Sequence, residues 1–177
     1  MSYILDLVGG MKRYSHGNLF VQTATKSCSN TTSETTLTHT GAGALTLPAN
    51  FFIAGRSLAI RAGGYFSSIV TPTLTIKIKY GSTVIATMTG TSVASTSKTW
   101  LLDAVITCRT TGSSGTVFTI ANYRELVAAG LNVGNNATGT VTINTTTSNA
   151  ISVTAQWGTA SASNNINMSN LILEAIA

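Results

Sequence analysis

Residues 45–67, LTLPANFFIAGRSLAIRAGGYFS, decide the fold. A first short strand ends at Pro48, because proline lacks the N–H that a central β-ladder needs. Gly55 then permits the backbone reversal that follows the apolar residues 51–53. Beyond the reversal, residues 56–66 alternate apolar and polar side chains with a period of two, which is typical of a half-buried strand. The stretch therefore predicts two β-strands joined at a tight corner.

The same alternation recurs on both sides of this corner. Residues 72–80 and 83–88 alternate around Gly81-Ser82, a two-residue turn of the glycine-first type, and this predicts a β-hairpin. Residues 26–33 are predicted to be a polar loop. Further strands are predicted over residues 18–25, 34–38, 99–109, 117–120, 140–144, 150–157 and 168–176.

One fragment has helical signals. Residues 122–130, NYRELVAAG, begin with Asn122 as a candidate N-cap, carry Glu125 three residues later as in a capping box, and end at Gly130. A helix of about two turns is marginal alone and depends on packing. We therefore expect one short helix over residues 122–130.

These elements predict an all-β, antiparallel β-sandwich of jelly-roll type, with roughly eight to ten short strands and one short helix. A parallel βαβ architecture is excluded by the lack of crossover helices. Residues 18–177 are predicted to form a single jelly-roll domain, and residues 1–17, whose composition differs from the rest, an N-terminal arm.

Composition favours a role in an assembly. Charged residues make up 8% of the chain, against about 25% in an average globular protein. Threonine, serine, asparagine and glycine replace them. Buried charge is costly in an interface, so a surface of hydroxyls and amides suits a protein that packs against others. The net charge of +5 comes from scattered basic residues, so no nucleic-acid partner is expected.

The first 17 residues hold an apolar run that includes Tyr3, Ile4, Leu5, Leu7 and Val8. No cationic region precedes it and Asp6 interrupts it, so we expect neither a signal peptide nor a membrane span. We therefore expect the protein to be synthesised in a cytoplasm. The run is interpreted in two ways: as an arm held by a neighbouring subunit, or as a first strand or packed turn of the same domain.

No motif for catalysis was found. The chain lacks GxSxG and HExxH motifs and a glycine-rich phosphate loop after a strand. Its histidines are His16 and His39, and its acids are Asp6, Glu34, Asp103, Glu125 and Glu174. Only a cleft that brought Glu34, Asp103 and a histidine together would favour an enzyme. We expect no enzyme, no cofactor, no metal site and no small-molecule substrate. Cys28 and Cys108, far apart in sequence, are expected to be free thiols.

Three segments carry a family resemblance. They are residues 34–67 with the "TLPAN…GR.L.I.A.G" corner, the lysine-bearing hairpin PTLTIKIKYGSTVI, and WLLDAVITCRTTGSSGTVF. This succession resembles jelly-roll virion proteins of tailed bacteriophages, namely head decoration (cement) proteins and tail or fibre components. The similarity covers residues 34–120 best.

The resemblance implies a capsid decoration protein that stabilises the head by bridging major capsid subunits as a homotrimer. The location would be the capsid surface of the virion. Tyr3, Ile4, Leu5, Leu7 and Val8 would then contact the capsid or an adjacent copy. The alternative is a tail or fibre receptor-binding module that recognises a host surface glycan, for which Tyr65, Tyr80, Tyr123 and Trp157 are the candidate stacking residues.

Overall fold

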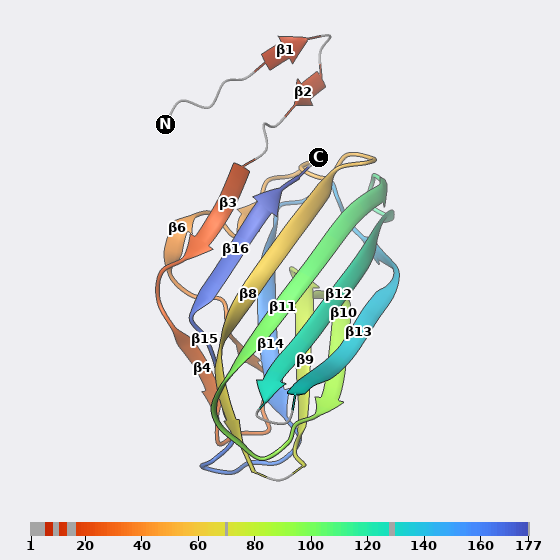
Figure 1. Cartoon of the computed structure of the whole chain (residues 1–177). Helices are drawn as coiled ribbons and strands as arrows, with labels where there is room; N and C mark the ends of the chain where they lie inside the picture. Colours follow the sequence, from red (N-terminus) through yellow and green to blue (C-terminus); the bar gives the residue numbers. More distant parts are fainter. Residues whose placement is uncertain (1–5, 9–10, 14–16, 70, 128–129, 177) are drawn as a thin grey trace.

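The protein is an all-β, two-sheet antiparallel sandwich in the computed structural model (Figure 1). The structure describes residues 6–8, 11–13, 17–69, 71–127 and 130–176, with side chains from residue 17 onward except at 130–137. Within these residues there is no helix, and hence none long and apolar enough to cross a membrane. The prediction of an all-β antiparallel sandwich is confirmed.

The larger sheet has nine strands, in the order β13-β12-β11-β8-β16-β3-β6, with β15 pairing both β8 and β4. Its strands are β3 (Gly17–Gln22), β4 (Lys26–Ser29), β6 (Gly41–Gly43), β8 (Ser57–Ser68), β11 (Ser95–Thr110), β12 (Gly115–Val127), β13 (Gly130–Ile143), β15 (Asn165–Met168) and β16 (Asn170–Ala175). Figure 1 shows this sheet in front. We call it the large sheet.

The smaller sheet has five strands, in the order β10-β9-β14-β5, with β7 also pairing β14. Its strands are β5 (Thr35–Thr36), β7 (Thr46–Leu47), β9 (Thr73–Tyr80), β10 (Thr83–Thr91) and β14 (Asn149–Trp157). In Figure 1 it lies behind the large sheet. We call it the small sheet. A separate hairpin of β1 (Asp6–Val8) and β2 (Met11–Arg13) lies beyond the start of β3.

The chain crosses between the sheets from β8 to β9 and back from β10 to β11, then again from β13 to β14 and back to β15. Such crossings occur in jelly rolls. In contrast, β11, β12 and β13 follow one another as neighbours in one sheet, as in a meander. The jelly-roll type stays a prediction. The sixteen strands among the described residues exceed the predicted eight to ten, because several are only two to four residues long.

The predicted hairpin is confirmed. Tyr80 pairs with Thr83 across the two-residue turn, and Gly81 has φ +59°, a conformation that a residue with a Cβ rarely adopts. The corner at residues 48–56 is confirmed as well, with Gly55 at φ +87°. Arg56 is buried there, donates a hydrogen bond to the carbonyl oxygen of Phe51 and lies over the Phe51 ring.

The predicted helix over residues 122–130 is wrong. Residues 122–127 belong to β12, which is hydrogen-bonded to β11 on one side and to β13 on the other. Ala121, Tyr123 and Glu125 point inward, whereas Asn122 and Arg124 alternate with them and are partly exposed. Interstrand hydrogen bonds on both sides of β12 stabilise the strand more than the capping residues could stabilise a helix of barely two turns.

The predicted polar loop over residues 26–33 is also wrong in part. Lys26–Ser29 form β4, which pairs with β15 so that Cys28 lies opposite Ile166. Cys28 is the one buried residue of the strand, since the other three are exposed. A single inward side chain gives too little alternation to indicate a strand from sequence.

The core lies between the sheets. Its largest fully buried side chains are Trp100 of β11, Trp157 of β14, Phe52 of the corner and Phe66 of β8. Both indoles have hydrogen-bond partners: Trp100 Nε1 donates to the Asn167 carbonyl (2.8 Å) and Trp157 Nε1 to the Cys28 carbonyl (3.2 Å). A buried aromatic residue with its polar atom satisfied is a stable core element, so these residues fix the distance between the sheets.

Candidate functional site

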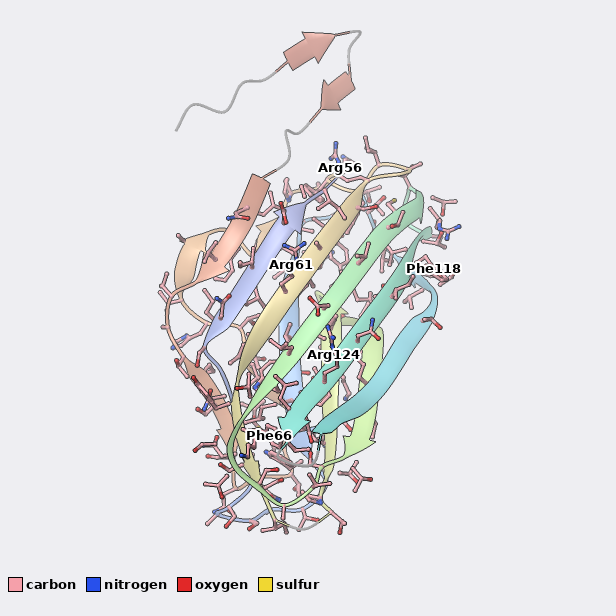
Figure 2. The ribbon with its side chains drawn as sticks, viewed as in Figure 1. Arg56, Arg61, Phe66, Phe118 and Arg124 are labelled. Carbon is pink, nitrogen blue, oxygen red and sulfur yellow. The ribbon has the colours of Figure 1, made fainter. Side chains whose placement is uncertain are left out.

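The outer surface of the large sheet is the candidate site. Strands β8, β11 and β12 send alternate side chains away from the core, and their register brings those side chains into rows. We call this surface the large-sheet face; it is made by Ala59, Arg61, Gly63, Tyr65, Leu101, Asp103, Val105, Ile120, Arg124 and Leu126, together with Ile172 and Glu174 of β16. Figure 2 looks onto it and labels Arg61 and Arg124.

Apolar side chains gather on this face. Tyr65 is 54% exposed, Leu101 38%, Val105 41%, Ile120 49% and Leu126 40%. Val105 lies directly opposite Ile120, and Thr99 joins Tyr65 to Leu126 in a second row. An antiparallel sheet that faces water normally alternates apolar-in with polar-out. The row of Arg61, Asp103 and Asn122 separates Val105 and Ile120 from the other three apolar residues. Large apolar side chains exposed on one face favour an interaction site there.

The face also carries two acids and three arginines. Arg124 Nη2 donates to Asp103 Oδ2 at 2.7 Å, from β12 to β11. Arg61 Nη1 lies 3.9 Å from Glu174 Oε2, and the Arg61 side chain is 66% exposed. Exposed ion pairs contribute about 0–1 kcal/mol each, so these charges do little for the stability of the sandwich. Arg109 of β11 also points outward and lies over the Phe118 ring of β12, so the face carries three arginines and two acids.

A groove along β8 consists of two parts, which are separated by the outward side chain of Arg61 and by Asp103, its cross-strand neighbour. One part, of about 460 Å³, is lined by Gly63, Gly64, Tyr65, Leu101 and other residues of β8, β11 and β16. A second part, of about 290 Å³, is lined by Ala59, Val105 and Ile120 among others, and both parts share Arg61 and Asp103. The groove exists because the outward positions 59 and 63 of β8 carry a methyl group and a hydrogen atom.

Backbone contacts require glycine next to this groove. A Cβ at Gly64 would lie 2.1 Å from the carbonyl oxygen of Asn167, and one at Gly63 would lie 2.8 Å from the carbonyl oxygen of Trp100. Here β15 ends and β16 begins, and the Ser169 N–H donates to the Gly63 carbonyl at 3.0 Å. Asn167 Oδ1 accepts from the Tyr65 N–H at 3.0 Å. These contacts hold Tyr65 beside the groove.

The outer surface of the small sheet is polar. We call it the small-sheet face; its outward residues on β9, β10 and β14 include Thr75, Lys77, Lys79, Thr87, Thr89, Ser152 and Gln156. Glu34 accepts from Lys77 Nζ at 2.6 Å and from Lys79 Nζ at 3.1 Å. The hydrogen bond from Lys77, with a smaller contribution from Lys79, lowers the pKa of Glu34 from 4.5 to about 2.

The residues predicted to contact the capsid fall largely outside the described part of the chain. Tyr3, Ile4 and Leu5 lie outside the described residues, and Leu7 and Val8 belong to β1, whose side chains are not described. β1 pairs with β2, with Leu7 opposite Lys12. The role of these five residues and the boundary of the arm at residue 17 stay predictions.

The structure separates the four aromatic candidates for glycan stacking. Tyr80, Tyr123 and Trp157 are buried in the core, so they cannot stack on a sugar. Tyr65 is exposed beside the groove. Sequence reasoning named Tyr65 but did not place it among Leu101, Val105, Ile120 and Leu126. Two of these, Leu101 and Val105, were visible in the sequence as apolar residues on the polar side of their strand.

The candidate catalytic residues do not converge. Glu34 binds lysines of the small sheet, whereas Asp103 binds Arg124 on the opposite surface of the sandwich. His39 is exposed and His16 lies outside the described residues. In the part of the chain that the structure describes, no three His, Cys, Asp or Glu residues form a group that could hold a metal ion.

Both cysteines are free and buried, so the prediction of free thiols is confirmed. Burial raises the pKa of the Cys28 and Cys108 thiols, which disfavours the reactive thiolate. Cys28 Sγ lies 3.6 Å from the carbonyl oxygen of Ala155. Both residues therefore act as small core side chains.

No protein-family model and no curated protein sequence matches the chain. Among solved structures it is similar to the CBM2 module of the evolved Dit of Lactobacillus casei BL23 phage J-1. The identity is 12% and the TM-score 0.31, over 73% of this chain and 66% of that chain. At this TM-score the likeness assigns neither a family nor a function.

Proposed function

We propose that the chain is a structural protein of a tailed-bacteriophage particle, and specifically a capsid decoration protein that bridges major capsid subunits as a homotrimer. The phage particle comes from the sequence resemblance of residues 34–120. The assembly role rests on one structural observation: the large-sheet face exposes five large apolar side chains, namely Tyr65, Leu101, Val105, Ile120 and Leu126. A protein that works by contact needs such a surface and needs neither a metal nor a catalytic cluster.

In this proposal the N-terminal arm attaches the protein to the particle. Figure 1 shows β1 and β2 beyond the start of β3 and away from the sandwich. The segment that includes Tyr3, Ile4, Leu5, Leu7 and Val8 would then reach a neighbouring capsid subunit. Binding through several arms of one oligomer multiplies weak contacts into stable attachment, and attachment to folded capsid subunits stabilises the head by mass action.

Deletion of residues 1–10 tests the attachment. The truncated protein should keep its oligomeric mass and its circular-dichroism spectrum but should no longer co-sediment with particles that lack the protein. Full occupancy of particles by the truncated protein would contradict the role of the arm. Quantitative mass spectrometry of purified virions tests the location: hundreds of copies per particle agree with decoration, and a handful would contradict it.

One observation favours a second function, a tail or fibre module that binds a host surface glycan. Tyr65 is 54% exposed and borders a groove with Arg61, Asp103 and Asn170. An aromatic ring beside hydrogen-bonding groups is a suitable platform for a sugar ring. Glycan-array binding that is lost on Tyr65→Ala, with the oligomeric mass unchanged, would favour this function over decoration.

A further inference from the structure

We infer that a pocket at one end of the sandwich binds a saccharide that carries an acidic group, and that Lys98 pairs with that group. The pocket, which we call the loop-end pocket, measures about 680 Å³ and is larger than either part of the β8 groove. This volume lies within the range of roughly 300–1,000 Å³ that is typical of small-molecule sites. The inference goes beyond the proposed function and does not depend on where in a particle the protein sits.

Three connections between the sheets form the loop-end pocket: β8 to β9, β10 to β11, and β14 to β15. Figure 1 shows them at the end of the sandwich opposite the two termini. Ser68 Oγ donates to the Val93 carbonyl oxygen at 2.6 Å, and Asn164 Oδ1 accepts from the Ile69 N–H at 3.0 Å. Asn164 is fully buried, and its Nδ2 donates to the Thr159 carbonyl oxygen at 2.8 Å. These bonds tie the connections to one another, and a pre-organised pocket loses less entropy when a ligand binds.

A β-bulge directs Lys98 toward the loop-end pocket. Ser95 of β11 lies opposite Ser68 of β8, and an unbroken register from there would place Lys98 opposite Tyr65, on the large-sheet face. The register shift between Ser95 and Lys98 instead places Lys98 opposite Phe66, on the inward side of the sheet. A shift of one residue moves a side chain to the other side of a sheet. Lys98 therefore lines the pocket because of the bulge.

The backbone beside the pocket is strained. Ser97 of the bulge has φ +50°, which few residues other than glycine adopt, and its N–H donates to Ser67 Oγ at 3.0 Å. Thr71, two residues beyond Ile69 of the lining, has φ +58°, and this conformation is rarer still for a β-branched residue. Strained residues cluster at ligand-binding sites, where the surrounding structure holds them in place. The strain is thus a second observation that favours a binding site here.

The charge of the pocket selects the class of ligand. Lys98 is the one charged side chain among the described residues that line it. None of the ion pairs between described residues involves Lys98. Glu125, which lies opposite Trp100 on β12, is buried and accepts from Ser92 and Tyr123, so it does not line the pocket. A lysine in a pocket without an acid favours a ligand with a negative charge.

The other lining residues match the hydroxyl groups of a sugar. Hydroxyl and amide side chains both donate and accept hydrogen bonds, and they make up six of the ten lining residues: Ser67, Ser68, Ser95, Thr96, Ser163 and Asn165. Ser95 Oγ and Asn165 Oδ1 are buried and have no hydrogen-bond partner in the part of the chain that the structure describes. An unpaired buried polar atom costs free energy, so rotation of either side chain toward a bound sugar would be favourable. The described lining contains no aromatic ring, and binding therefore depends on charge and hydrogen bonds.

A glycan array tests the class of ligand on the full chain. Carboxylated, sulfated and phosphorylated sugars are each printed beside the neutral sugar with the same skeleton. We expect binding to at least one acidic sugar and at least tenfold weaker binding to its neutral counterpart. Binding to no acidic sugar, or equal binding to both members of every pair, overturns the inference.

Substitution of Lys98 tests the site. In isothermal titration calorimetry with the acidic sugar found on the array, Lys98→Gln should weaken binding at least tenfold, whereas Lys98→Arg should retain it. Lys26→Gln is the matched control, because Lys26 is exposed on β4 and does not line the pocket, and its loss changes the net charge equally. Unchanged affinity in Lys98→Gln overturns the inference.

A second variant blocks the pocket without changing its charge. Ala162 is exposed in the connection from β14 to β15 and lines the pocket, so Ala162→Trp should abolish binding and leave the core intact. Tyr65→Ala, on the large-sheet face, should leave binding unchanged. Binding that is lost in Tyr65→Ala but kept in Lys98→Gln and Ala162→Trp overturns the inference and places the sugar at Tyr65. Capsid binding by the protein is measured separately, so either proposal can fail alone.

Discussion

The two outer faces of the sandwich are built by the same fold and carry opposite surfaces. On the small-sheet face, Lys77, Lys79 and Glu34 form a charged cluster and the surrounding residues are mostly threonine, serine and glutamine. On the large-sheet face, exposed apolar side chains are interspersed with two ion pairs. Water can satisfy the hydrogen-bonding groups of the small-sheet face. The large-sheet face exposes apolar side chains, which association with another molecule would bury. In the function proposed above, contact with another protein buries the large-sheet face.

Neighbouring residues of β11 provide the largest expected effect. Trp100 points inward and is fully buried, whereas Leu101 points outward. Trp100→Ala should lower the free energy of unfolding by about 3–5 kcal/mol, and Leu101→Ala by about 1 kcal/mol or less in the dissociated chain. Urea unfolding at a protein concentration low enough for dissociation measures both. Equal losses would contradict the assignment of inner and outer residues on β11.

Substitution of Glu125, on the inner side of β12, should give the next largest loss of stability. It is buried and accepts hydrogen bonds from Ser92 Oγ at 2.6 Å and from Tyr123 Oη at 2.9 Å. Glu125→Ala removes this acceptor from two buried hydroxyls and should cost about 2–4 kcal/mol, since each unsatisfied group costs about 1–3 kcal/mol. Arg124→Ala, on the outer side, is the control and should cost less than about 1 kcal/mol. Thermal unfolding compares the two variants.

Substitution of a glycine beside the groove should give a smaller loss of stability. Gly64→Ala would place a Cβ 2.1 Å from the Asn167 carbonyl oxygen, so the backbone between β15 and β16 must move. We expect a loss of about 1–3 kcal/mol and a weakened association. Gly139→Ala in β13 meets nothing within 4 Å and should leave the stability within about 0.5 kcal/mol of the wild type. Similar effects of the two substitutions would argue against a rigid groove.

The small-sheet face gives the smallest effect. The pKa of Glu34 is lowered from 4.5 to about 2, so its contribution to stability is present above pH 4.5 and is lost as the pH falls toward 2. Solvent screens this exposed cluster, and Glu34→Gln should cost about 1 kcal/mol or less at neutral pH. In urea unfolding, the difference between wild type and variant should shrink between pH 4.5 and 2. A constant difference across that range would contradict the lysine contacts.

Sequence reasoning located the strands where the signal was local. The hairpin around Gly81 and the corner at Gly55 follow from alternation and turn residues, and both are confirmed. It failed at residues 122–130, because the capping signals there are local and the two neighbouring strands that override them are distant in sequence. It also missed β4, in which only Cys28 faces inward.

The candidate site could not be predicted from the sequence for a related reason. Alternation tells which side chains of a strand point outward, but it does not tell which strands are neighbours. The register of β11 and β12 places Val105 opposite Ile120, and the groove needs β8 beside β11 and β16. Leu101 and Val105 alone indicated that the outer side of one strand was apolar. The surface they belong to emerges only from the order of the sheet.

Hydroxyl-radical footprinting read by mass spectrometry tests the central claim most directly, because it reports on both outer faces in one experiment. The wild type is compared with the Val105→Glu, Ile120→Glu variant at the same concentration. We expect Tyr65 and Leu101 to be oxidised several-fold more slowly in the wild type, and Val84 of the small sheet to be oxidised equally in both. Equal oxidation of Tyr65 and Leu101 in the two proteins would show that nothing covers the large-sheet face and would contradict the account.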